Sequence, residues 1–93
     1  MTKRKNRDLI KFGSIIREHR MNLSLKKDTR SYFLDDRVRQ GLIEYEDLSV
    51  KTLTNIENGY NLPSLSTLKI LSTALEIDFF QLLADVYDYI PRQ

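Results

Sequence analysis

Apolar positions recur along the 93-residue chain mostly at intervals of three and four residues, which is the spacing of one face of an α-helix. The chain has only three glycines and two prolines to interrupt this pattern. The pattern predicts a single all-α domain with five helices and no internal repeat. The expected helices cover about residues 7–21, 28–40, 49–59, 64–75 and 78–90.

Side chains that favour helix ends support these boundaries. Ser49, Ser64 and Asp78 can each accept a hydrogen bond from a backbone N–H of the following turn, as N-cap residues do. Gly41 is expected just beyond the second helix, where a left-handed backbone is common. The acidic segment 42–47 is predicted to form a loop or a single turn. The apolar sides of the helices are expected to contain Leu9, Phe12, Ile15 and Ile16; Tyr32, Phe33, Leu34 and Val38; Leu53 and Ile56; Leu65, Leu68, Leu71 and Leu75; and the apolar residues from Phe79 to Ile90.

Two residues of the first helix carry further information. Gly13 costs the helix about 1 kcal/mol relative to alanine, so it indicates a close approach of another helix. His19 lies at the edge of the apolar stripe. We interpret it as a hydrogen-bonded packing residue rather than as a ligand or a catalytic group.

Composition limits the classes of protein to which the chain can belong. Hydrophobic residues make up 41% and charged residues 30%, as in soluble globular proteins. No apolar run approaches the roughly 18–20 residues of a membrane span, and none follows the basic N-terminus as in a secretory signal. We therefore expect a cytoplasmic protein without a membrane partner. The absence of cysteine and the single histidine exclude cysteine-ligated and histidine-rich metal sites, so we expect no metal and no cofactor.

No motif indicates catalysis. The chain lacks a cysteine nucleophile and a glycine-rich phosphate loop. Asp35 and Asp36 are adjacent on a predicted helix, so their side chains diverge and would not share a site. Glu44, Glu46 and Asp47 form a solvated acidic loop more readily than a cation site. We expect neither an enzyme nor a small-molecule substrate.

Charge is unevenly distributed, although the net charge is only +2. Residues 1–30 hold ten basic and three acidic residues, a net charge of +7, whereas residues 31–60 hold three against six and residues 61–93 two against four. The basic end would attract a polyanion such as nucleic acid, although a solvated tail explains it equally well. We expect a basic tail over residues 1–8 and a folded domain over residues 9–90. The residues of this tail that could act as an arm on DNA are Lys3, Arg4, Lys5 and Arg7.

The helix predicted over residues 49–59 has two chemically different sides. Leu53 and Ile56 share the side that must be buried. Lys51, Asn55 and Asn58 lie nearly opposite, with Thr54 beside them. Amides, a cation and a hydroxyl can pair with base edges in a major groove, although such residues are also ordinary on a solvated face.

Three separated stretches resemble one family in the same order. They are Phe12 to Arg20, the tetrapeptide Ile56-Glu57-Asn58-Gly59, and Leu75 to Leu83. Together they resemble the Cro/repressor-type helix-turn-helix family, also called the XRE family, over roughly residues 9–83. The stretch from Lys26 to Leu48 is longer than the family's usual connection, and we place the extra residues in 42–47. The resemblance implies a compact five-helix, lambda-repressor-like fold.

The resemblance also implies roles for individual residues. Val50, Lys51 and Asn55 match positions that would meet base edges, while Val50 could equally be packed beside Leu53. Thr54 is a further candidate for a base contact because of its place on the same helix face. An ion pair between Arg20 and Glu57 would join the first and third helices. The residues expected at phosphates are Lys26, Lys27, Ser49, Thr52, Asn58, Tyr60 and Asn61.

These observations favour a sequence-specific transcriptional regulator, most simply a repressor, that binds double-stranded DNA as a homodimer. The dimer surface would be the apolar face of the fifth helix, with Phe80, Leu83, Tyr87 and Ile90, unless that face only packs within the domain. The alternative is a protein-interaction module of the same fold, an antitoxin-like or anti-regulator partner. It would use the acidic loop 44–47 and the aromatic C-terminal end.

Overall fold

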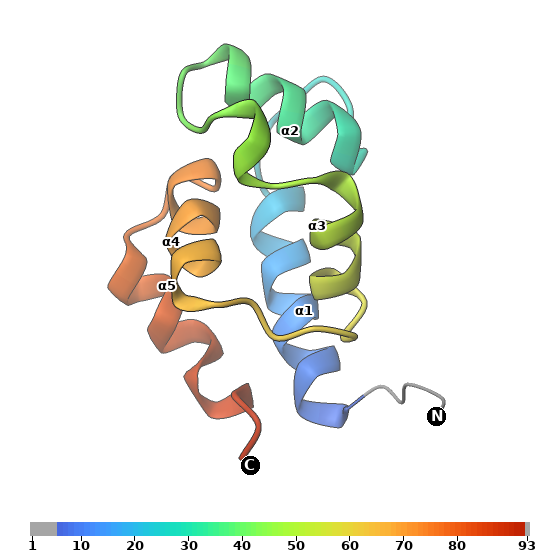
Figure 1. Ribbon diagram of the computed structural model, residues 1–93, viewed down its shortest axis with the longest axis vertical. Helices are drawn as coiled ribbons and strands as arrows, with labels where there is room; N and C mark the ends of the chain where they lie inside the picture. The colour runs from blue at the N-terminus through green and yellow to red at the C-terminus, as the bar shows by residue number, and fades with distance from the viewer. Residues whose placement is uncertain (1–5, 93) are drawn as a thin grey trace.

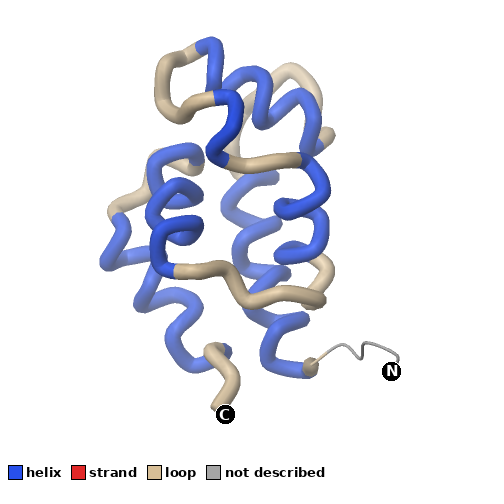
Figure 2. The backbone as a smooth tube through the Cα atoms, in the orientation of Figure 1, coloured by secondary structure: helices blue, strands red, loops and turns tan. Residues whose placement is uncertain are grey.

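The computed structural model describes residues 6–92, and this part of the chain is helical without any strand (Figures 1 and 2). Its elements are α1 (Arg7–Met21), α2 (Arg30–Arg39), the short 3₁₀ helix η1 (Tyr45–Asp47), α3 (Val50–Glu57), α4 (Leu65–Ala74), α5 (Phe79–Val86) and the 3₁₀ helix η2 (Tyr87–Tyr89). The expected all-α architecture of five α-helices is confirmed.

Each of the five α-helices begins at a side chain that accepts a hydrogen bond from a backbone N–H of its own first turn. The acceptors are Asn6, Thr29, Ser49, Ser64 and Asp78. Such caps satisfy donors that have no partner inside the helix. Short polar side chains at these positions therefore set where each helix begins.

The core lies between α1 and the other helices. In Figure 1, α1 runs through the middle of the molecule with α3 on one side and α4 on the other, while α2 lies across one end. α5 packs against α4 and α1, and η2 also contacts α1. The fully or nearly buried apolar side chains are Phe12, Ile16, Phe33, Leu34, Ile43, Leu48, Leu53, Ile56, Leu68, Leu71, Ala74, Leu75, Leu82 and Val86.

Gly13 marks the closest approach of α1 to α3, as its position in the sequence predicts. A Cβ atom built on Gly13 would lie 2.2 Å from the carbonyl oxygen of Ile56 and 2.5 Å from that of Glu57. No side chain fits this gap, so glycine is required there for steric reasons. The contact fixes α3 at a short distance from the central helix.

His19 has the packing role expected from the sequence. Its Nε2 atom lies 3.0 Å from Oδ2 of Asp85 on α5, and both side chains are half-buried. Gln81 donates a second hydrogen bond to Oδ1 of the same carboxylate, at 2.8 Å. The histidine thus joins α1 to α5.

Three boundary predictions and one burial prediction need correction. Arg7 is the first residue of α1, so the tail expected over residues 1–8 does not extend to it. Leu65 is exposed, because the first residue of α4 precedes the turn that packs on the core. α3 ends at Glu57 with Asn58 as its C-cap, two residues before Gly59. α5 ends at Val86, and the expected continuation toward Pro91 is replaced by η2.

No helix within residues 6–92 is both long enough and apolar enough to cross a membrane.

Candidate nucleic-acid interface

One side of α3 anchors the helix and the other side faces outward. Leu53 and Ile56 are buried in the core. On the opposite side Lys51 is exposed, while Asn55 is half-buried. Thr54 is also half-buried, and its hydroxyl donates a hydrogen bond to the backbone carbonyl of Val50 at 2.7 Å. The face predicted for base contacts therefore presents the ammonium group of Lys51 and the amide of Asn55. The Thr54 hydroxyl can still accept a hydrogen bond, but its proton is already donated to Val50.

The N-terminus of α3 is held by a reciprocal pair of hydrogen bonds. Ser49 Oγ accepts from the backbone N–H of Thr52 and donates to its hydroxyl, both at 3.0 Å. Val50 follows with 44% of its surface exposed. Its side chain is available for an apolar contact rather than packed away beside Leu53, so the first turn of α3 is rigid and open to solvent.

Arg20 and Glu57 form the ion pair that the resemblance implies. The Nε and terminal nitrogens of Arg20 lie 2.7 and 2.9 Å from the two carboxylate oxygens, and both side chains are almost fully buried. Arg20 also donates to the backbone carbonyl of Asp28 at 2.6 Å. Arg30 adds a third contact, from its Nε to Glu57 at 2.9 Å. One buried carboxylate thereby fixes α3 relative to α1 and to the start of α2.

The Arg30 contact was not predicted from the sequence. Arg30 is the first residue of α2, and nothing in its local pattern shows which carboxylate it will face. The contact with Glu57 depends on the tertiary structure, in which α2 crosses the ends of α1 and α3. Its side chain remains about one quarter exposed, so it borders the surface as well as the ion pair.

The basic loop before α2 lies at the surface. Lys26 and Lys27 are exposed, and Thr29 caps the helix that follows them. The two cations therefore precede the N-terminus of a helix, whose backbone N–H groups favour anions. Both side chains are accessible from solvent, and their contact with phosphate stays a prediction.

The segment that follows α3 turns sharply at Gly59, which has a φ of +82°. Asn58 is exposed at the C-cap of α3. The backbone N–H groups of Tyr60 and Asn61 both donate to the carbonyl oxygen of Asn55, at 2.9 and 3.4 Å. These bonds hold the segment against the end of α3, so that predicted phosphate-contacting residues flank this helix at both ends.

Of the residues expected to form an N-terminal arm, Arg7 lies within the described part of the chain. Lys3, Arg4 and Lys5 lie outside the described residues. Arg7 is exposed on the first turn of α1, with Lys11 one turn further along and Asn6 as the cap before it. The charge of Arg7 therefore belongs to a helix face rather than to an arm.

A buried charged cluster joins α2 to the end of α4, and sequence reasoning missed it. Arg37 contacts Asp36, and it donates to Glu76 at 2.7 Å and to the carbonyl of Ala74 at 3.3 Å. Burial lowers the pKa of Arg37, but its hydrogen bonds to the two carboxylates outweigh that effect and raise the pKa above its ordinary value. The available signal was spacing, since Arg37 follows the buried Phe33 by four residues and shares its helix face.

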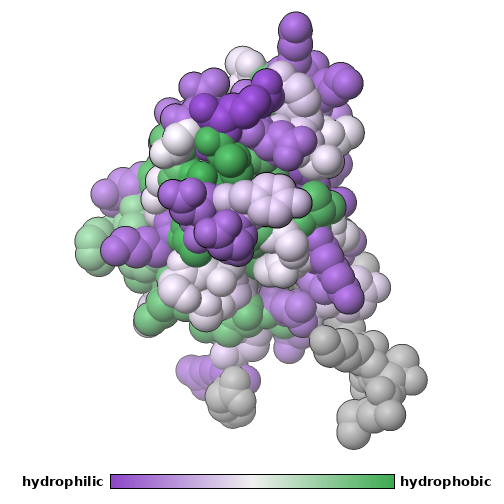
Figure 3. All heavy atoms as spheres, turned by 45° about the horizontal axis from the view of Figure 1, so that its top comes forward, coloured by the Kyte–Doolittle hydropathy of each residue, from purple (hydrophilic) through white to green (hydrophobic). Residues whose placement is uncertain are grey.

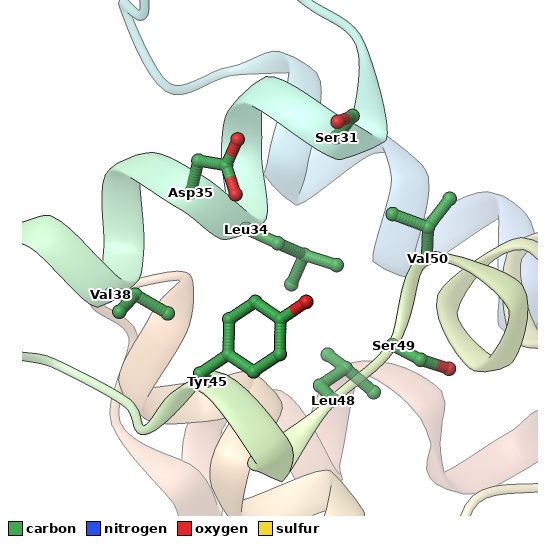
Figure 4. A pocket seen from close by; sticks show the side chains of 8 residues that line it. All are labelled: Ser31, Leu34, Asp35, Val38, Tyr45, Leu48, Ser49 and Val50. Atoms are coloured by element: carbon green, nitrogen blue, oxygen red, sulfur yellow. The ribbon is translucent and has the colours of Figure 1, made fainter.

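A hollow of about 250 Å³ opens where α2, η1 and the start of α3 meet. Figure 4 shows the Tyr45 ring at this hollow, together with Leu34 and Val38 of α2 and with Leu48, Ser49 and Val50. The lining is completed by Ser31 and Asp35. This end of the molecule is mostly hydrophilic in the space-filling view, with apolar side chains visible between the polar ones (Figure 3).

The C-terminal end carries large apolar side chains at the surface. Phe80 is 74% exposed and Tyr87 is 68% exposed, and Ile90 is also exposed. Leu83 differs from these three because it is half-buried and packs against the core. Three of the four residues expected at a dimer surface are therefore accessible, while Leu83 serves mainly within the domain.

Within residues 6–92, no group of three or more histidine, cysteine, aspartate or glutamate side chains is placed to hold a metal ion.

Residues 47–88 match the family model described as "Helix-turn-helix". This match supports a Cro/repressor-type helix-turn-helix domain over that part of the chain. The match begins within η1 and extends through α3, α4 and α5, so the long connection after α2 falls almost entirely before it. The match supports a DNA-binding regulator of this type. No curated protein and no solved structure shows a significant match to the chain.

Proposed function

We propose that this protein is a transcriptional repressor that recognises a specific double-stranded DNA sequence by inserting α3 into the major groove. The observation that carries the proposal is the outward side of α3, where Lys51 is exposed and Asn55 is partly exposed opposite the buried Leu53 and Ile56. Lysine can donate to guanine, and asparagine can pair with adenine through two hydrogen bonds. Val50 adds an apolar group that fits a thymine methyl.

Phosphate contacts would supply most of the affinity, because cations that neutralise phosphates release condensed counterions. Lys26 and Lys27 are exposed in the loop before α2, and Ser49 and Thr52 lie at the start of α3. Asn58, Tyr60 and Asn61 follow the other end of the helix. Contacts at both ends would fix the register of α3 in the groove, whereas the side chains between them would select the sequence.

We also propose that the protein binds as a homodimer through the exposed apolar side chains of α5 and η2. Phe80 and Tyr87 would lose the most solvent contact in such an interface. Two α3 helices would then meet half-sites about one helical turn apart. Repression follows if the bound dimer covers a promoter.

Selection of bound DNA from a random-sequence pool tests this function directly. We expect enrichment of one pseudo-palindromic sequence, and binding that weakens steeply with added salt. The double variant Lys51→Ala/Asn55→Ala should lose the selected site without a change in melting temperature. Exposed Lys69→Ala on α4 provides a charge-matched control that should retain binding. A pool from which no sequence is enriched would instead favour a protein-interaction module.

A reporter gene separates repressor from activator. With the selected sequence placed over a promoter, we expect expression to fall when the protein is supplied and to recover with the Lys51→Ala/Asn55→Ala variant. Increased expression would contradict the repressor role while leaving DNA recognition intact.

A further inference from the structure

We propose that Tyr45, on the turn inserted between α2 and α3, is a specificity-determining DNA contact outside the recognition helix. The inference rests on the proposed insertion of α3 into the major groove. It assigns to the long connection a function that the shorter connection of a compact helix-turn-helix could not perform.

Tyr45 is held in place but not buried. Its side chain is 81% exposed, although it is a large aromatic residue. The turn that carries it lies between two core residues, Ile43 and Leu48. It is closed by hydrogen bonds from the backbone N–H of Glu44 to Asp47 Oδ2 at 2.8 Å and from the N–H of Asp47 to the carbonyl of Glu44 at 3.0 Å. The ring is thus presented to solvent from a fixed backbone, which reduces the entropy lost on binding.

Tyr45 lies close to the N-terminal end of α3, which is the end proposed to enter the major groove. Tyr45 and Val50 line the same hollow, with Ser31 from the first turn of α2 (Figure 4). In helix-turn-helix domains the N-terminal residues of the recognition helix contact base edges. A groove that receives Val50 would therefore also bring DNA against the Tyr45 ring.

The charge around the hollow favours a base edge over a phosphate. Asp35 is the one charged residue among those that line the hollow, and it is an acid. The carboxylate of Asp47 turns back to cap its own turn and borders a separate hollow beside Lys69. Successive residues of a 3₁₀ turn project about 120° apart, so Glu46 points away from Tyr45. Arg39 lines a separate hollow with Tyr45 that Val50 does not border, so a phosphate inside the hollow shared with Val50 would meet Asp35 and no lining cation, whereas the edge of a base can meet an aromatic ring.

The size of the hollow argues against a small-molecule effector. Its volume of about 250 Å³ lies below the roughly 300–1,000 Å³ of most ligand pockets. Tyrosine, in contrast, supplies a large and rigid contact area with only two side-chain torsions to fix. The hollow is therefore better suited to a group that projects from DNA than to a separate ligand.

The test compares Tyr45→Ala with the neighbouring variant Glu46→Ala on the sequence selected by the wild-type protein. We expect Tyr45→Ala to weaken binding to that sequence about 5- to 30-fold, which lies in the lower part of the range for one good base contact. A repeated selection should show lost preference at a base pair adjacent to the one affected by Val50→Ala. Binding to unrelated DNA and the melting temperature should not change, and Glu46→Ala should bind at least as tightly as the wild-type protein.

Two results would overturn the proposal. Unchanged affinity and unchanged selected sequence in Tyr45→Ala would show that the ring does not contact DNA. An equal loss on selected and unrelated DNA would place Tyr45 on the sugar–phosphate backbone, without a role in specificity. If the wild-type protein selects a sequence that depends on Lys51 and Asn55, either result refutes this inference alone. If the wild-type protein selects none, the proposed function fails as well.

Discussion

Gly13 of α1 lies so close to Ile56 of α3 that a methyl group on Gly13 would stand 2.2 Å from the Ile56 carbonyl oxygen. The obstructing atoms belong to the backbone of a packed helix, so they cannot move aside as a flexible side chain would. The short distance between α1 and α3 therefore depends on the absence of a side chain at Gly13. The same distance determines how far α3 projects from the rest of the domain.

We predict that Gly13→Ala destabilises the protein despite the better helix propensity of alanine. Propensity would contribute about 1 kcal/mol in favour of the variant, whereas overpacking typically costs about 1–3 kcal/mol and is severe against backbone. Urea unfolding followed by circular dichroism measures the difference. The control is Ser14→Ala at the adjacent exposed position, which should be neutral or slightly stabilising. A Gly13→Ala variant more stable than the wild-type protein would contradict the close packing.

We predict that Glu57→Ala lowers the free energy of unfolding by about 3–5 kcal/mol, because it leaves Arg20 buried without its carboxylate. Arg30→Ala should cost much less, since its side chain is partly exposed and can be hydrated. Denaturant titrations of the three proteins give the comparison. Equal stability of Glu57→Ala and the wild-type protein would show that the buried pair contributes nothing. Glu57→Gln provides a milder variant if the alanine protein does not fold.

Glu76 combines an unfavourable backbone conformation with an ion pair, and two substitutions can separate the contributions of these features to stability. It has a φ of +56°, a left-handed conformation that is unfavourable for residues other than glycine, and its carboxylate contacts Arg37. Glu76→Ala and Glu76→Gly both remove the carboxylate, but only glycine relieves the backbone. We expect the glycine variant to be more stable than the alanine variant by about 1 kcal/mol in thermal or urea unfolding. Equal stabilities would argue that the backbone at this position is not strained.

We predict that Lys27→Ala weakens DNA binding about equally on specific and unrelated sequences. A phosphate contact carries no sequence information, and its loss should reduce the slope of log affinity against log salt by about 1. Lys51→Ala should instead relax the preference at one base pair. Fluorescence anisotropy over a range of salt concentrations separates the two. A change of sequence preference in Lys27→Ala would place that residue in the groove.

We predict that Tyr87→Glu prevents self-association, because a charge would be buried in an apolar interface. Leu65→Glu is a matched control, since Leu65 is similarly exposed but belongs to α4 and is not among the residues expected at the interface. Sedimentation equilibrium should show dimers for the wild-type protein and for Leu65→Glu, and monomers for Tyr87→Glu. A wild-type protein that stays monomeric at high micromolar concentration would refute the proposed dimer.

The local pattern of residues was sufficient to predict the helices and most of their ends. Capping serines and an aspartate, a glycine beyond α2 and apolar residues at helical spacing act over a few residues, so their effect is visible in the chain itself. The same locality explains why α3 could be assigned a buried and an outward side. The Arg20–Glu57 pair was reached through a motif, because its partners lie 37 residues apart.

Tertiary structure alone decided which distant groups meet. Arg30 reaches Glu57, Arg37 reaches Glu76, and Tyr45 stands beside the start of α3, although no local signal names these partners. It also decided that Leu65 and Phe80 stay at the surface while Leu68 and Leu82 are buried. Periodicity gives the apolar side of a helix, but burial depends on how far along its length a neighbouring helix covers it. The covered length depends on where the helices cross one another. These crossing points result from the packing of the whole domain rather than from the sequence of any one segment.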